Sequence, residues 1–280
     1  MTQSIELRHA VHPADARGFD TARLRREFLV TGLFPADRIR LVYSHVERMI
    51  VGGCAPVAGR LSLAAPKEIG TTDFLARREL AAVNLGGPGR VFVGGERFDI
   101  AKGEAVYAGM GAGEVALESA DPANPARFAL FSTPAHRACP TLKLDAATGR
   151  RIAAGAAETA NAREIHQMLI PGAVESCQLV FGITRFKPGS VWNTMPCHTH
   201  DRRSEIYLYF DLAADARVFH LMGEPKETRH LVIANEEAII SPGWPIHSGC
   251  GTRNYAFVWA MAGDNQDFTD MDMVAMGELR

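Results

Sequence analysis

Residues 197–210 read CHTHDRRSEIYLYF and carry the strongest structural signal in the chain. Two imidazoles, His198 and His200, stand two positions apart, and side chains at that spacing on a β-strand point to the same face. Glu205 follows five positions later, an odd offset that would send its carboxylate to the opposite face of one continuous strand. The sequence therefore predicts a bend within the polar residues 201–204 and a new alternating strand over residues 205–210.

A further candidate ligand, His247, follows the turn-rich residues 241–245, SPGWP. It can approach the histidine pair only if the sheet closes on itself. Three neutral imidazoles and one carboxylate form a donor set that suits Zn, Fe, Mn, Ni or Co. We therefore predict one divalent-metal site with His198, His200, Glu205 and His247 as ligands. The alternative is a set of separate surface or core side chains.

Composition narrows the class of protein. The 280 residues, 47% of them hydrophobic, suffice for two modest domains or one large one. A net charge of -2 gives no reason to expect nucleic acid or a membrane surface as partner. The five cysteines show neither CxxC pairs nor an even disulfide framework, and no apolar run is long enough for a signal peptide or a membrane span. We expect a cytoplasmic protein with reduced thiols that acts on a small molecule.

Strand signals dominate the chain. Short runs of Val, Ile, Phe and Tyr recur between clusters of Gly, Pro and Asp, a pattern typical of antiparallel sandwiches and barrels. Helical signals are confined to residues 21–29, preceded by Asp20 as N-cap, and to residues 161–168. The alanine-rich residues 145–160 indicate a linker. The sequence thus predicts an all-β chain with a few short helices and two antiparallel, jelly-roll-like barrels, at residues 1–145 and 146–280.

The two halves also echo each other. The motif RREL at residues 77–80 and the motif RRSE at residues 202–205 each precede an apolar strand. Aligning the glutamates of these motifs places Thr72 and Phe74 at the positions of the histidine pair. We therefore expect the first barrel to lack metal ligands and the second to carry the chemistry; the alternative is a coincidence between two β-rich halves.

The order of these residues resembles the two sequence motifs of the cupin superfamily. A closer resemblance covers nearly the whole chain and rests on residues 77–80 (RREL), 192–200 (WNTMPCHTH), 227–230 (ETRH) and 270–272 (DMD). On these motifs the chain is similar to the 5-keto-4-deoxyuronate isomerase family, whose members are also called 4-deoxy-L-threo-5-hexosulose-uronate ketol-isomerases.

The resemblance implies a bicupin subunit, one zinc ion per subunit on the four ligands named above, and a homohexamer. It implies an aldose-ketose isomerase, an intramolecular oxidoreductase, that converts 5-dehydro-4-deoxy-D-glucuronate to 3-deoxy-D-glycero-2,5-hexodiulosonate in pectin degradation. The alternatives are the 5-deoxyglucuronate isomerase of inositol breakdown, a cupin oxygenase, and a non-enzymatic sugar-binding cupin. An oxygenase would prefer redox-active iron or copper.

Ketol isomerisation also requires a base, which the sequence does not identify. Tyr207 and Tyr209 share the predicted face of Glu205, and a hairpin turning at residues 223–227 would set His220 roughly opposite His230. These three, Tyr207, Tyr209 and His220, are the catalytic candidates. The alternative for each is a place in the core or in a cross-strand pair.

A uronate substrate carries a carboxylate, which calls for a cation. Arg202, Arg203 and Arg229 lie near the predicted mouth of the second barrel and are the candidate substrate-binding residues, since a guanidinium binds a carboxylate through two parallel hydrogen bonds. The alternative is that these arginines are solvated surface charges.

Overall fold

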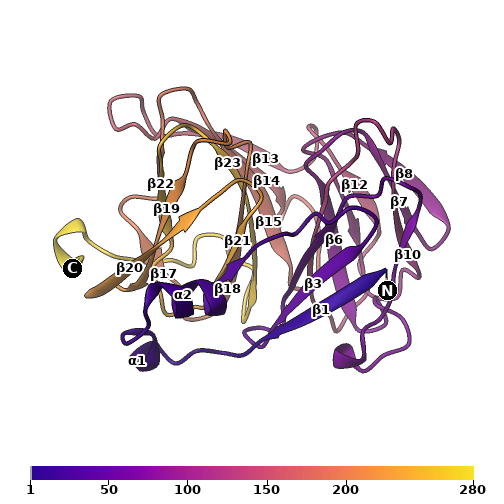
Figure 1. Cartoon of the computed structure of the whole chain (residues 1–280), viewed down its shortest axis with the longest axis horizontal. Coiled ribbons are helices and arrows are strands. Elements are labelled where there is room, and N and C mark those ends of the chain that lie inside the picture. Colours follow the sequence, from indigo (N-terminus) through magenta and orange to yellow (C-terminus); the bar gives the residue numbers. More distant parts are fainter. Residues whose placement is uncertain (1) are drawn as a thin grey trace. The chain divides into compact units, whose positions relative to one another are not determined.

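The computed structural model describes residues 2–280, which form β-strands joined by turns, with α-helices only near the N-terminus of the described chain (Figure 1). The chain forms compact units that interleave along the sequence. Unit 1 contains residues 2–8, Gly32–Gly149 and Met168–Leu179; unit 2 contains His9–Thr31, Arg150–Gln167 and Val180–Arg280. The predicted domains are two continuous ranges that meet at residues 145 and 146, whereas each of these units is assembled from three separate ranges.

Unit 1 is built from a larger sheet, in the order β1-β3-β4-β11-β6-β9-β12, and a smaller one, in the order β5-β10-β7-β8. The strands are β1 (Gln3–Arg8), β3 (Ile39–Ser44), β4 (Ile50–Cys54), β5 (Leu61–Leu63), β6 (Arg78–Asn84), β7 (Gly89–Val93), β8 (Glu96–Ile100), β9 (Ala105–Ala108), β10 (Val115–Ser119), β11 (Phe128–Pro134) and β12 (Leu142–Leu144), with a 3-10 turn at Lys67–Ile69. Inward-facing side chains of both sheets, among them Leu41, Leu80, Val91, Leu117 and Phe128, form one buried apolar cluster. Unit 1 is therefore a sandwich of antiparallel character whose interior is apolar.

Unit 2 has the same plan, with a larger sheet in the order β13-β14-β15-β23-β18-β21-β2 and a smaller one in the order β16-β22-β19-β20. The strands are β2 (Leu29–Val30), β13 (Arg150–Ala154), β14 (Arg163–Leu169), β15 (Val180–Phe186), β16 (Trp192–Asn193), β18 (Arg203–Phe210), β19 (Val218–Glu224), β20 (Glu227–Ile233), β21 (Ala238–Ser241), β22 (Ser248–Gly251) and β23 (Ala256–Gly263). A separate pair, β17 (His198–Thr199) with β24 (Asp272–Met273), and a 3-10 turn at Met276–Glu278 complete it.

The sheet orders of the units correspond strand by strand. In the larger sheets, β6 lies between β11 and β9, just as β18 lies between β23 and β21. The edge position beside β21 is filled by β2, which comes from the N-terminal segment shown in indigo in Figure 1. This correspondence confirms the predicted all-β fold of two barrel-like sandwiches.

The N-terminal helices pack on unit 2. After α1 (Pro13–Ala16), α2 (Thr21–Phe28) begins at the predicted N-cap Asp20, whose carboxylate accepts from the backbone N–H of Arg23 at 2.8 Å. Its buried side chains are Leu24 and Phe28, and the helix lies against β20 and β21. The prediction of a capped helix here is confirmed, and burial of its apolar stripe explains why so short a helix is stable.

The predicted helix at 161–168 is wrong, because most of these residues form the strand β14. The predicted linker at 145–160 contains a boundary between the units, at Gly149 and Arg150, and also the strand β13. The two strands pair antiparallel, with Ile152 opposite Ile165. Cross-strand pairing supplies each strand with hydrogen bonds and contacts that neither segment has alone, so the tertiary context overrides local helical propensity.

The cysteines within residues 2–280 are all free thiols, as expected. Cys197 is fully buried against Ile246 and Val274. The described helices include none with the length and apolar character needed to cross a bilayer.

Candidate active site

Four side chains from separate segments of unit 2 converge on one point. His198 lies on β17, His200 follows it, Glu205 lies on β18 and His247 directly precedes β22. One ligand atom of each, an imidazole nitrogen or a carboxylate oxygen, lies within 4.8 Å of the others, and all four residues are buried. The structure therefore brings together the four residues predicted as ligands.

A tight turn joins the histidine pair to the glutamate strand. The backbone N–H of Arg203 donates to the carbonyl of His200 at 3.1 Å, so the chain bends at residues 201–202, where the bend was predicted. Gly243, in the loop before His247, packs against this turn: a Cβ there would lie 2.9 Å from the carbonyl oxygen of His200. Only glycine allows this close approach, which carries His247 to the histidine pair.

The orientation of His200 is fixed by the backbone. Its Nδ1 lies 3.0 Å from the carbonyl oxygen of Arg203, and because a carbonyl can only accept, Nδ1 must carry the hydrogen. In the neutral ring, Nε2 then carries a lone pair and no hydrogen. This atom lies 3.2 Å from Oε2 of Glu205. Two acceptors at this distance repel unless a proton or a cation lies between them. This contact is an observation that favours a positive ion at the centre of the cluster.

The other two imidazoles point to the same conclusion. Nε2 of His247 lies 2.9 Å from Nε2 of His198 and 3.1 Å from Oε2 of Glu205. The Nδ1 atoms of His198 and His247 are buried and have no hydrogen-bond partner among residues 2–280. The donor set of three imidazoles and a carboxylate, all aimed inward, fits a divalent metal ion.

The electrostatics of the cluster favour a neutral imidazole at His198 and a carboxylate at Glu205, the forms in which these side chains bind a metal. Burial and the neighbouring His247 lower the pKa of His198 to about 3, so this ring is neutral at pH 7. Burial opposes ionisation of Glu205, yet the imidazoles of His247 and His200 outweigh it and hold the pKa of the carboxyl well below its usual range. Burial likewise opposes a charge on His200, but its contact with Glu205 raises the pKa of that ring. The carboxylate thus attracts positive charge to the centre.

A cavity of about 320 Å³ opens onto the cluster. Its polar lining includes His198, His200, Glu205, Arg203 and Tyr207. Apolar side chains form much of the remaining wall: Ile165, Met195, Phe257, Trp259, Met261, Phe268, Met271 and Met273. A cavity of this size, largely apolar with a few convergent polar groups, is typical of a small-molecule site.

Of the catalytic candidates, Tyr207 lines the cavity, whereas Tyr209 and His220 do not. The hydroxyl of Tyr209 lies 2.7 Å from Nδ1 of His220, and both side chains are fully buried. The predicted pairing of His220 with His230 is off by one residue, because His220 stands opposite Leu231. Since neighbours along a strand alternate between faces, His220 points into the unit while His230 is exposed.

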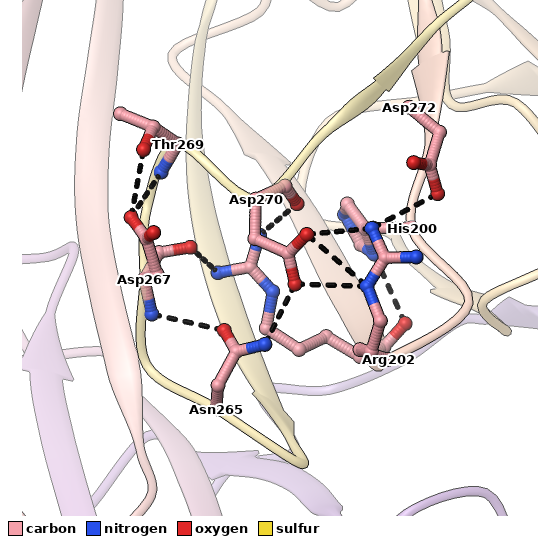
Figure 2. A network of polar contacts seen from close by, with 8 residues as sticks. His200, Arg202, Asn265, Asp267, Thr269, Asp270 and Asp272 are labelled. Carbon is pink, nitrogen blue, oxygen red and sulfur yellow. Dashed lines mark hydrogen bonds and ion pairs between the residues drawn. The ribbon is translucent and has the colours of Figure 1, made fainter.

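The candidate arginines have different surroundings. Arg203 is buried, lines the cavity and donates to the backbone carbonyls of Asp267 and Asp270 at 2.5 and 2.6 Å. Arg202 instead forms ion pairs with Asp270 at 2.5 Å and with Asp272 at 3.0 Å (Figure 2). Arg229 pairs with Glu227 at 2.7 Å and does not line the cavity.

Sequence reasoning missed four polar residues of the cavity wall: Arg163, Thr184, Asn193 and Thr194. Asn193 and Thr194 lie inside the motif at 192–200, so a signal was present. Nδ2 of Asn193 is buried without a hydrogen-bond partner among residues 2–280, and Thr194 has a φ of 52°, a left-handed conformation that is rare for a β-branched residue. Arg163 lies in the segment predicted as a helix, and no sequence motif there indicated a residue of the cavity wall.

Comparison with known proteins places the chain among enzymes. Residues 34–276 match the sequence model of the KduI/IolB family. The 4-deoxy-L-threo-5-hexosulose-uronate ketol-isomerase 2 of Rhizobium meliloti (strain 1021) is 56% identical over 98% of this chain and 97% of its own length. The enzyme of that name from Lachnoclostridium phytofermentans is 49% identical over 99% of this chain and 100% of its own.

Solved structures agree on the fold. An IolB-like protein from Salmonella typhimurium LT2 superposes with a TM-score of 0.66 at 14% identity, covering 88% of this chain and 96% of the other. Oxalate decarboxylase of Bacillus subtilis, a protein with Mn(II) centres, gives a TM-score of 0.52 at 10% identity, covering 80% and 71%. At these identities the likeness concerns the bicupin fold alone, which agrees with the architecture expected from the sequence.

Proposed function

The chain belongs to the KduI/IolB family, and from this we propose that it is a 4-deoxy-L-threo-5-hexosulose-uronate ketol-isomerase. The substrate is 5-dehydro-4-deoxy-D-glucuronate, the product is 3-deoxy-D-glycero-2,5-hexodiulosonate, and the reaction belongs to the breakdown of pectin-derived uronates. The observation that carries the proposal is 56% identity, over almost the full length of both chains, to an enzyme of that name. The buried cluster of three histidines and a glutamate beside a cavity supports it.

We assign His198, His200, Glu205 and His247 as the ligands of one zinc ion per subunit. Neutral imidazole and carboxylate are ligands that zinc accepts readily, and the convergence of their donor atoms supports this assignment. When bound, a divalent ion supplies positive charge beside the two neighbouring oxygens on which negative charge develops during an aldose-ketose conversion. Manganese and iron suit the same donor set, so metal analysis of the purified protein decides the identity.

Tyr207 is the group we assign to proton donation. Apart from the proposed ligands and the two arginines, it is the titratable side chain of the cavity wall in the described part of the chain. Burial raises the pKa of Tyr207 well above its ordinary value, with a smaller contribution from the charge of Glu205. Its hydroxyl is therefore protonated at neutral pH, and it can donate a hydrogen bond or a proton to a substrate oxygen.

Neighbouring groups hold and shield the reacting atoms. Asn193 and Thr194 line the cavity together with Tyr207, and their side chains oppose part of the rise in the pKa of Tyr207. The unpartnered Nδ2 of Asn193 can donate to a substrate oxygen. The apolar wall, with Phe257 and Trp259, limits water around the reacting carbons and strengthens every polar contact inside.

The experiment that tests this function uses enzymatically produced 5-dehydro-4-deoxy-D-glucuronate and follows its conversion by NMR. We expect conversion to the 2,5-diketo acid by the purified protein, loss of conversion in excess chelator, and recovery on adding zinc. A parallel reaction with 5-deoxyglucuronate separates the proposed activity from the alternative, a 5-deoxyglucuronate isomerase. Absence of metal-dependent conversion would rule out the proposal, and oxygen consumption would favour an oxygenase instead.

Location and assembly are part of the same proposal. We infer a cytoplasmic homohexamer that acts on a small uronate and binds neither nucleic acid nor membrane, on the basis of the family resemblance and the net charge of -2. Sedimentation velocity of the purified protein tests the assembly. A mass of about one chain, 30.4 kDa, would contradict it.

A further inference from the structure

Arg163 places a guanidinium in the wall of the cavity. It begins β14, and alternation along this strand sends Arg163 and Ile165 into the cavity lining. The residue between them, Glu164, is not part of the lining and forms an ion pair with Arg151 at 2.8 Å. The nearest carboxylate in the sequence is thus engaged elsewhere.

Within residues 2–280, no carboxylate forms an ion pair with the guanidinium of Arg163. One of its nitrogens, Nη1, donates to the backbone carbonyl of Asn161 at 2.9 Å. Burial lowers the pKa of Arg163, and no carboxylate is among the groups that oppose this effect. A partly buried cation without an anion is unfavourable, and proteins retain one where a ligand supplies the missing charge.

The other cavity arginine is already committed. Arg203 uses both terminal nitrogens on the carbonyls of Asp267 and Asp270, and so holds the C-terminal segment against the turn after His200. Arg202 is neutralised by its carboxylate partners outside the lining (Figure 2). Arg203 keeps only a buried Nε without a partner, whereas Arg163 uses Nη1 alone, so that in the described chain Nε and Nη2 of Arg163 remain together for an anion.

We propose that Arg163 binds the carboxylate of the sugar acid and so sets the preference of the site for uronates over neutral sugars. The inference rests on the proposed function for the identity of the acid, but the unpaired charge stands on its own. A guanidinium presents parallel N–H groups that match a carboxylate, and the apolar wall beside it strengthens the pair. The substrate is then anchored at its carboxylate end, while its carbonyl end can reach the histidine cluster in the same cavity.

The kinetic test compares Arg163→Met with Arg163→Lys. For the uronate, we expect Arg163→Met to raise KM by roughly 30- to 100-fold with a smaller change in kcat, because truncating one partner of a shielded charge pair weakens binding. Arg163→Lys keeps the positive charge but loses the parallel N–H groups of the guanidinium, so its KM should be intermediate. With the methyl ester of the uronate, wild type and Arg163→Met should have similar KM values. An unchanged KM for the uronate in Arg163→Met would overturn the proposal.

A matched control separates substrate binding from folding. Arg185, on β15, is also partly buried and its pKa is also lowered by burial, but it does not line the cavity. Arg185→Met should leave the KM for the uronate unchanged. Metal content should be the same in all variants, and the thermal midpoint of Arg163→Met should be equal to or above that of wild type, since an uncompensated charge is removed. A parallel loss of stability and affinity in Arg163→Met alone would indicate a structural role and overturn the inference.

A binding measurement distinguishes failure of this inference from failure of the proposed function. Calorimetry of the metal-loaded protein with D-glucuronate, a stable hexuronate, requires no turnover. Binding by wild type that is lost in Arg163→Met supports the carboxylate site even if no isomerisation is found. Isomerisation by wild type with Arg163-independent affinity keeps the function and overturns the inference. Absence of both turnover and hexuronate binding would overturn both.

Discussion

Leu80 in unit 1 and Glu205 in unit 2 occupy equivalent positions. Leu80 on β6 stands opposite Ala108, the last residue of β9, and Glu205 on β18 stands opposite Ser241, the last residue of β21. Leu80 packs in the apolar interior of its unit, where Glu205 instead contributes a carboxylate to the histidine cluster. The sequence alignment of Glu79 with Glu205 is therefore wrong by one residue, and on a strand that slip changes the face.

Metal stoichiometry follows from this equivalence. We expect the purified protein to bind one divalent ion per chain, because unit 1 has leucine at the position where unit 2 has its carboxylate. Glu205→Gln and His198→Ala should each reduce affinity by more than the roughly 10- to 100-fold seen when outer-shell partners are changed. Elemental analysis after dialysis against zinc measures the stoichiometry of the wild type and the loss of metal from the variants. Two ions per chain, or full metal content in Glu205→Gln, would contradict the ligand assignment.

Glu79 should matter for stability rather than for metal. This fully buried carboxylate accepts from the backbone N–H groups of Cys177, Gln178 and Leu179 at 2.7, 2.6 and 2.6 Å, and from Tyr107 at 2.5 Å. Glu79→Leu leaves these donors unpaired, so we expect it to lower the free energy of unfolding by roughly 3–5 kcal/mol. Urea denaturation measures the loss.

The matched control for Glu79 is Glu114→Gln, an exposed glutamate of the same unit, which should change the free energy of unfolding by less than about 0.5 kcal/mol. Metal content should be normal in both variants. A stable Glu79→Leu protein would show that residues 177–179 are held by other contacts.

Tyr207→Phe should lower kcat by about 10²- to 10⁴-fold, since it removes the hydroxyl assigned to proton donation while keeping the ring. Metal content and thermal midpoint should change little. Tyr209→Phe offers a comparison on the same strand, because the Tyr209 hydroxyl contacts His220 and not the cavity. Its effect on kcat should be much smaller, and equal losses in the two variants would remove Tyr207 from this role.

The ion pair between Arg202 and Asp270 predicts a pH-dependent contribution to stability. Hydrogen bonds from Arg202 and from Asn265 lower the pKa of Asp270 in the folded protein (Figure 2). A carboxyl with a depressed folded pKa stabilises the fold above its unfolded pKa, about 3.9, and this contribution disappears as the pH falls through the folded pKa. Asp270→Asn should therefore lower the thermal midpoint at pH 7, with the difference from wild type shrinking below about pH 4.

This comparison is made in excess chelator, so that acid release of metal does not contribute. The exposed Asp264, replaced by Asn, serves as control and should show no pH-dependent difference from wild type. A constant difference between Asp270→Asn and wild type from pH 7 to pH 3 would show that charge is not the cause.

Local sequence determined the bend at the candidate site, the face of one strand and the start of a helix. The spacing of His198, His200 and Glu205 required a bend between two strands, and the bend lies at residues 201–202. Strand alternation placed Tyr207 on the face of Glu205, and Asp20 marked the start of α2. These features depend on strand periodicity and capping, which act over a few residues and are therefore legible in a single sequence.

Only the tertiary structure decided which charges face the cavity and which pair with one another. The sequence offered Arg202, Arg203 and Arg229 as equals, yet ion pairs formed over long sequence distances occupy Arg202, and Arg163 lines the cavity from a strand that was predicted as helix. The register of β6, one residue away from the motif alignment, likewise depends on its pairing with β9 and β11. Strand pairing joins residues far apart in the chain, so register, face and counter-ion are fixed only when the sheets form.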